Sequence, residues 1–137
     1  MSFEWQDLRL SIQRLSRRIQ FTNDPADVTE SQRNVLSTLD LHGPQTLNSL
    51  SEHERVTAPS MSRNVKALVK AGLVTRVTDE EDSRKLRIDL TPEGRKLVRH
   101  ARQQRNVWFA EKLAALPLEQ QKLLEQVTPI LKTLANE

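Results

Sequence analysis

Apolar residues recur at helical spacing through the first third of the chain. Leucines and isoleucines three and four residues apart predict an amphipathic helix over residues 3–21. A second helix is predicted after Thr29, whose hydroxyl suits an N-cap, and the His-Gly-Pro run at 42–44 ends it. A short helix over residues 46–54 has two apolar anchors, enough only for a helix packed on its neighbours.

The middle of the chain combines a helix that has a polar face with two alternating strands. Thr57 can cap this helix, an apolar stripe runs along it, and Gly72 suits the left-handed residue that ends many helices. One strand is predicted over 73–77, and period-two alternation predicts another over 86–90; a long polar loop joins them. The two strands are expected to form a β-hairpin.

Two further helices follow the hairpin. Thr91 and Pro92 begin the first, as N-cap and first helical residue, and it runs to about Ala115. The second is rich in leucine, and Pro129 in its interior is expected to kink or split it. The chain is therefore predicted to be mainly α with a small β-hairpin (α+β), as a single domain over residues 1–137.

Positive charge is concentrated in the middle of the chain. The net charge is +3, but residues 55–105 hold 13 basic and 6 acidic residues. A polyanion would bind there, although a solvated basic face accounts for the same excess. Hydrophobic residues make up only 36% of the chain, so we expect part of its apolar surface to be buried against a second chain.

Composition excludes several classes of function. Cysteine is absent, which rules out disulfides, thiolate metal sites and thiol redox sensing. Because the chain has only 3 glycines and lacks a nucleophile-elbow motif, no enzymatic activity and no cofactor are expected. His42, His53 and His100 are far apart and lack metal-ligand spacing. No stretch approaches the roughly 20 apolar residues that span a bilayer, and the N-terminus does not resemble a signal peptide, so we expect a soluble cytoplasmic protein with no membrane partner.

The elements from residue 46 to residue 90 have the order of a helix-turn-helix followed by a wing. A helix fits the major groove of B-DNA, and its N-terminus presents partial positive charge to phosphates. In this chain, the N-terminal end of the helix that Thr57 caps carries small hydroxyl donors and one guanidinium: Thr57, Ser60, Ser62 and Arg63. An ordinary amphipathic helix with a polar exposed face is the alternative.

The loop of the hairpin carries an acidic run next to a basic pair, in the sequence DEEDSRKLRIDLT (79–91). An arginine at a hairpin tip can enter a minor groove, most favourably where A·T-rich DNA narrows it. Asp82 lies two residues before Arg84, a spacing at which a carboxylate can hold the guanidinium by paired hydrogen bonds. A solvated loop with chance charge neighbours is the alternative.

Three segments resemble the MarR-type winged-helix transcriptional regulators. They are VTESQRNVLSTL, similar to the second helix of that family, VTAPSMSRNVKALVKAGLVTR, similar to its recognition helix, and DSRKLRIDLTPEG, similar to its wing. The resemblance implies a homodimeric DNA-binding regulator, expected to be a repressor, on pseudo-palindromic double-stranded operator DNA. It also implies dimerisation helices at 1–28 and 91–137 around a winged helix-turn-helix lobe at 29–90.

The resemblance further implies roles for individual side chains. The expected DNA contacts are Thr57, Pro59, Ser60, Ser62, Arg63, Lys66, Arg84 and Lys85. The first five would face the major groove, Lys66 a phosphate, and Arg84 the minor groove, directed by Asp82. Departures from the family pattern are Asn64, where an apolar residue is usual, Ser83 and Pro129.

A ligand site is also implied by the resemblance. Members of such a family often release DNA when a small aromatic ligand binds between the dimer helices and the DNA-binding lobe. Arg18, His42 and Trp108 are candidate lining residues in this chain. Nothing in their spacing brings them together, so core packing or dimer contacts are the alternative role.

Two other classes of function stay open. A winged-helix protein–protein adaptor would use the same face without specific DNA binding, although a serine-rich polar surface suits that role poorly. A membrane-surface protein would place the arginine-rich stretch 95–105 on anionic lipid. A steep loss of binding with added salt distinguishes DNA from an adaptor's partner, and lipid vesicles test the third class.

Overall fold

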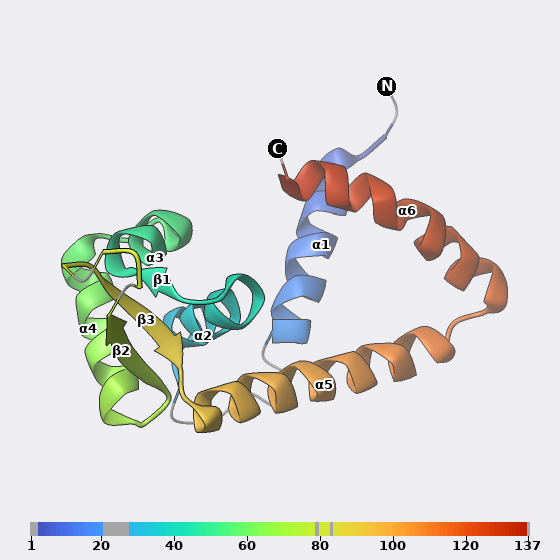
Figure 1. Ribbon diagram of the computed structural model, residues 1–137. Coiled ribbons are helices and arrows are strands. Elements are labelled where there is room, and N and C mark those ends of the chain that lie inside the picture. The colour runs from blue at the N-terminus through green and yellow to red at the C-terminus, as the bar shows by residue number, and fades with distance from the viewer. Residues whose placement is uncertain (1–2, 21–27, 79, 83, 137) are drawn as a thin grey trace. The chain divides into compact units, whose positions relative to one another are not determined.

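The computed structural model describes residues 3–20, 28–78, 80–82 and 84–136 of the chain (Figure 1). These residues form helices and a small antiparallel sheet: α1 (Trp5–Gln20), α2 (Glu30–His42), β1 (Gln45–Thr46), α3 (Leu47–Glu54), α4 (Ala58–Lys70), β2 (Val74–Thr78), β3 (Leu86–Leu90), α5 (Pro92–Ala114) and α6 (Leu118–Asn136). They belong to two compact units, the terminal unit (Met1–Asn23 and Gln103–Glu137) and the central unit (Asp24–Arg102). The predicted fold class, mainly α with a small β component, is confirmed.

The central unit is built around a core of aliphatic side chains. α2, α3 and α4 contribute the apolar residues expected from their spacing, and the sheet and the first part of α5 complete the core. Leu36, Leu50 and Met61 are fully buried, one from each of the three helices. The short helix α3 is therefore held by its neighbours, as its few apolar anchors require.

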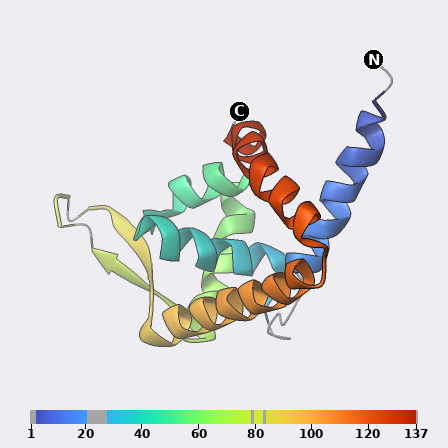
Figure 2. The same ribbon diagram turned by 90° about the vertical axis from the view of Figure 1, so that its right-hand side faces the viewer.

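The sheet has one strand more than the predicted hairpin. β2 pairs with one edge of β3 and β1 with the other, in the order β1-β3-β2. β1 is only two residues long, too short to show a period-two pattern, so the sequence did not reveal it. Beside this pairing, the Arg87 guanidinium donates a hydrogen bond to the Pro44 carbonyl at 3.3 Å. Figure 2 shows β2 and β3 side by side, projecting from the helices of the central unit.

Local signals start and end the helices of this unit. A threonine hydroxyl before each of α2, α3 and α4 accepts a hydrogen bond from the backbone N–H three residues later; these residues are Thr29, Thr46 and Thr57. Each bond satisfies an N–H that has no partner inside its helix. Gly72, with φ +76°, follows the end of α4 in the left-handed conformation, as predicted. Arg55 takes up a similar conformation, φ +54°, in the turn between α3 and α4.

The start of α5 is tied to the chain that follows α4. The Thr91 hydroxyl accepts a hydrogen bond from the Gly94 N–H at 3.0 Å and donates one to the Gly72 carbonyl at 2.6 Å. Gly94 is buried, and a Cβ at this position would collide with the backbone carbonyl of Leu73. The glycine thus allows α5 to lie directly against the chain that enters β2.

The first part of α5 belongs to the central unit, which extends to Arg102 and so beyond the lobe end expected at residue 90. Val98 lies in the core. The Asp40 carboxylate of α2, only 3% exposed, is 3.3 Å from Arg99 Nε and 2.7 Å from Arg102 Nη1. These contacts between distant residues join α5 to α2, and no local pattern signals them.

In the terminal unit, α1 and α6 bury none of their described residues. Large exposed apolar side chains follow the predicted helical spacing: Leu8, Ile12 and Leu15 on α1, and Leu123, Leu124, Val127, Ile130, Leu131 and Leu134 on α6. Pro129 does not split α6, which is continuous from Leu118 to Asn136. The backbone carbonyl that loses its partner to Pro129 belongs to Glu125, an exposed residue, so water can satisfy it.

Candidate nucleic-acid interface

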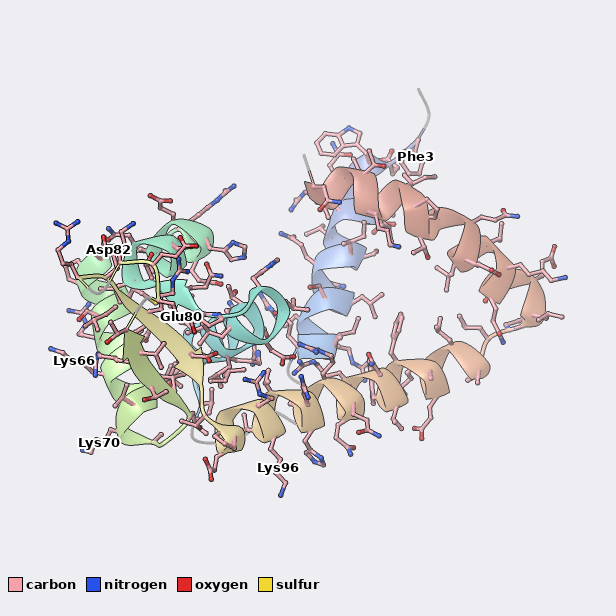
Figure 3. All side chains as sticks on the ribbon, in the orientation of Figure 1. Phe3, Lys66, Lys70, Glu80, Asp82 and Lys96 are labelled. Atoms are coloured by element: carbon pink, nitrogen blue, oxygen red, sulfur yellow. The ribbon has the colours of Figure 1, made fainter. Side chains whose placement is uncertain are left out.

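α4 has one apolar face and one polar face. Met61, Val65 and Leu68 are buried on the inner side. The side chains expected at DNA lie on the helix and its cap: Thr57, Pro59, Arg63 and Lys66 are exposed, and Ser60 and Ser62 are half-buried. Figure 3 shows Lys66 and Lys70 pointing away from the rest of the central unit. The helix therefore offers polar and basic groups to a partner without exposing the core.

A short series of hydrogen bonds joins the side chains in the first turns of α4. The Ser60 backbone N–H donates to the Thr57 hydroxyl at 3.2 Å. Arg63 Nη2 donates to the Ser60 hydroxyl at 3.1 Å. The guanidinium is thereby drawn toward the N-terminus of α4, where the helix dipole also favours anions.

The tip of the hairpin holds an arginine in a fixed direction. Asp82 Oδ1 accepts hydrogen bonds from the backbone N–H and from Nε of Arg84, each at 3.1 Å, and Oδ2 lies 3.5 Å from Nη2. The Arg84 side chain is nevertheless 89% exposed, against 30% for Asp82. An ion pair this open adds at most about 1 kcal/mol to stability. Its main effect is to restrict the direction of the guanidinium, which the spacing of the two residues predicts.

Acidic and basic residues share the loop around this pair. Lys85 is exposed, and its backbone N–H donates to the Asp82 carbonyl at 3.0 Å. Glu80 and Glu81 are exposed on the same loop, and Figure 3 shows where Glu80 and Asp82 lie. Asp79 and Ser83, which belong to the acidic run and the wing motif, lie outside the described residues.

The three residues expected at a ligand site are divided between the two units. Arg18 and Trp108 meet in the terminal unit, with the guanidinium carbon 5.5 Å from the centre of the indole ring. His42 belongs to the central unit, where its ring centre is 5.6 Å from that of His53. These two histidines are far apart in the sequence but neighbours in space, because the ends of α2 and α3 meet. Within the described part of the chain, no cluster of three or more His, Asp or Glu side chains is placed to hold a metal ion.

Asn64 has a partner that its sequence context does not reveal. Its Nδ2 donates a hydrogen bond to the Ser31 hydroxyl of α2 at 2.7 Å. The available signal was a polar residue at the edge of the apolar stripe of α4. That signal indicates that a partner is needed but does not say which element supplies it.

Known proteins share this arrangement. The family model for the MarR family matches residues 28–86, which include α2, α3, α4 and β2 and end at the first residue of β3. The helix-turn-helix-type transcriptional regulator MT0903.1 of Mycobacterium tuberculosis (strain CDC 1551 / Oshkosh) is 35% identical over 131 residues, covering 96% of this chain and 92% of that protein. The chain belongs to the MarR family. The predicted family is confirmed, and the protein is a DNA-binding transcriptional regulator of this family and not an enzyme.

Solved structures are similar over nearly the whole chain. RV1404 from Mycobacterium tuberculosis has a TM-score of 0.86 and 25% identity, covering 96% of this chain and 92% of that one. A point mutant of MepR from S. aureus, bound to an oligodeoxyribonucleotide, has a TM-score of 0.70 and 23% identity, covering 97% of this chain and 99% of that one. Among the described residues, no helix is both long and apolar enough to cross a membrane.

Proposed function

We propose that this MarR-family protein is a homodimeric repressor that binds a pseudo-palindromic operator in double-stranded DNA. One observation carries the proposal: the Arg84 guanidinium is held by Asp82 and is still 89% exposed at the tip of a hairpin. A directed, solvent-facing guanidinium suits a narrow minor groove, where the negative potential is deepest. The protein acts in the cytoplasm.

In this proposal α4 enters the adjacent major groove. The residues of α4 and its cap that contact base edges are Thr57, Pro59, Ser60, Ser62 and Arg63. Lys66 of α4 and Lys85 of the wing contact phosphates. This assignment is supported by the two faces of α4: its apolar stripe is buried, and its polar and basic side chains are on the opposite, accessible face. The MepR mutant with a similar fold was solved with an oligodeoxyribonucleotide bound, which supports this use of the fold.

A second copy of the chain covers the terminal unit. None of the described residues of α1 and α6 is buried within one copy of the chain, and their exposed leucines and isoleucines form continuous rows along each helix. Large exposed apolar surfaces mark sites where a partner binds. An apolar groove of about 880 Å³ in the same unit is lined by Leu15, Phe109, Leu113, Leu116, Leu124 and Leu131, among others. A two-fold dimer carries two copies of α4, so the operator half-sites should lie about 10 bp apart, centre to centre.

A small aromatic acid releases the DNA in the same proposal. Arg18 offers a cation and Trp108 an aromatic face, and Lys112 Nζ lies 5.8 Å from the centre of the same ring. These groups suit a carboxylate attached to a ring. Added benzoate should raise the melting temperature of the parent protein and leave that of Trp108→Ala unchanged. If Arg18 and Trp108 only pack against each other and bind no ligand, benzoate should raise the melting temperature of neither protein.

The deciding measurement is a fluorescence-anisotropy titration of the full chain against two duplexes of equal length. One comes from upstream of its own gene and the other is unrelated DNA. We expect a preference for the upstream duplex, an affinity that falls steeply between two salt concentrations, and loss of most of the preference in Arg84→Ala. Equal affinity for both duplexes would contradict specific binding to that operator. No binding to either at low salt would favour a protein–protein adaptor.

A further inference from the structure

We infer that Asn64 is a positioning residue that determines DNA specificity: its hydrogen bond to Ser31 fixes the rotation of α4 about its own axis. The inference rests on the proposed function and deepens it. It concerns how accurately the outer face of α4 is aimed at base edges, which the contact residues themselves do not decide.

The bond attaches α4 to the capped first turn of α2. Asn64 Nδ2 lies 2.7 Å from Ser31 Oγ, and the bond is part-buried and joins residues 33 apart in the sequence. Ser31 is in the first turn of α2, between the two members of a capping box in which the Thr29 hydroxyl accepts from the Gln32 N–H and the Gln32 side chain accepts from the Thr29 N–H. A capped helix start has little freedom to move, so the acceptor stays where it is.

Asn64 stands at the boundary between the two faces of α4. The buried stripe includes Met61 and Val65, while Arg63 next to it is exposed. Close packing of this stripe prevents large rotations, but apolar contacts have no preferred direction, so they oppose a small rotation less sharply than a hydrogen bond does. A hydrogen bond weakens steeply as its angle closes, and this one acts at the level of Arg63 and Ser60.

The geometry of a helix shows why a small rotation matters. Side-chain atoms lie about 5–6 Å from the helix axis. A turn of about 20° therefore moves them by about 2 Å, more than a hydrogen bond to a base edge tolerates. Phosphate contacts depend on charge more than on aim. Loss of the bond should thus weaken binding to the operator and leave binding to unrelated DNA almost unchanged.

The test compares two duplexes in anisotropy titrations of the full chain. One is the duplex that the unchanged protein enriches from a randomised pool, and the other is the same sequence shuffled. Ser31→Ala and Asn64→Leu each remove the bond, and each should lower the ratio of the two affinities by about three- to tenfold. The double variant should lose no more than either single variant, because both remove one bond. Ser31→Thr keeps the hydroxyl and should keep the ratio of the parent.

Thr38→Val is the matched control. The Thr38 hydroxyl donates to Glu54 Oε1 at 3.1 Å, so the variant removes a bond between α2 and α3 and keeps the bond between Asn64 and Ser31. Its melting temperature should fall while its affinity ratio stays that of the parent. An unchanged ratio in Ser31→Ala and Asn64→Leu, or an equal loss on both duplexes, would overturn the inference. A parent protein that binds both duplexes equally would overturn the proposed function, and the inference with it.

Discussion

The Asp82 carboxylate brings a negative charge to the same hairpin tip that presents Arg84. Simple electrostatics predicts that its removal strengthens binding to any polyanion, because repulsion from the phosphates is relieved. Its hydrogen bonds predict the opposite for the operator, because they aim the guanidinium. At the scale of single residues, these two effects separate when operator and unrelated DNA are compared.

Asp82→Ala should weaken operator binding by about two- to fivefold, because Arg84 loses its direction, and should leave or strengthen binding to unrelated DNA. Arg84→Lys should have the same effect on operator binding as Asp82→Ala, because lysine keeps the positive charge but lacks the planar guanidinium with its paired N–H donors. Anisotropy titrations with both duplexes measure the two affinities. Glu80→Ala is the control, since it removes an exposed acid from the same loop and should strengthen binding to both. A weaker operator complex in Glu80→Ala as well would count against the orienting role.

Arg63 and Lys66 are neighbouring exposed cations of α4 with different proposed partners. Arg63→Ala should cost about 1–3 kcal/mol on the operator and relax the base preference at one position of each half-site. Lys66→Ala should weaken binding to all sequences alike and reduce the slope of log affinity against log salt by about 1. Titrations against operators with single base changes distinguish the two. An equal loss on every sequence for Arg63→Ala would assign that residue to phosphate instead.

At the scale of elements, the helix starts depend on neighbouring residues, whereas the junction of α5 with the sheet depends on close backbone approach. Thr57 caps α4 through a bond to a residue three positions on. Gly94 instead leaves room for the backbone carbonyl of Leu73, which lies far earlier in the chain. The same carbonyl accepts a hydrogen bond from the Thr91 N–H at 3.0 Å. A side chain at Gly94 would push α5 away from this contact.

Gly94→Ala sets two effects against each other. Alanine favours a helix over glycine by about 1 kcal/mol. The added Cβ would meet backbone and not a movable side chain, so overpacking should prevail and the free energy of unfolding should fall by about 1–3 kcal/mol. Urea denaturation of the full chain measures the change. Glu93→Ala, at an exposed neighbouring position, should stay within about 0.5 kcal/mol of the parent. A Gly94→Ala protein as stable as the parent would contradict the close approach.

At the scale of the whole molecule, the two units differ in how complete they are. The central unit has its own buried core, drawn from its helices and its sheet. In the terminal unit, the apolar rows of α1 and α6 are not buried. The modest hydrophobic content of the sequence, 36%, is consistent with a chain that shares part of its core with a second copy.

Leu131→Asp should dissociate the proposed dimer, because it places a charge among apolar side chains of α6 that line the groove. Light scattering after size exclusion should change from about twice the 15.8 kDa chain mass toward that mass. Operator affinity should fall with it, since two half-sites are no longer bound together. Gln126→Asp, outside the apolar row of the same helix, adds the same charge and should stay dimeric. A dimeric Leu131→Asp protein would exclude this face as the interface.

The sequence by itself determined the helix limits, the hairpin and the family. Caps such as Thr57 and breaks such as Gly72 act within a few residues, and helical spacing shows which face of a helix turns inward. The Asp82–Arg84 pair was predictable for the same reason, because its two members are two residues apart.

Only the tertiary structure decided what each inward face meets. The strand β1, the Asn64–Ser31 bond, the Asp40 contacts to α5 and the approach of Gly94 to Leu73 all join elements far apart in the chain. Periodicity identifies a buried or polar position but carries no information about its partner. That partner is chosen when the elements pack, since only then do side chains from different elements compete for the same space and the same hydrogen bonds.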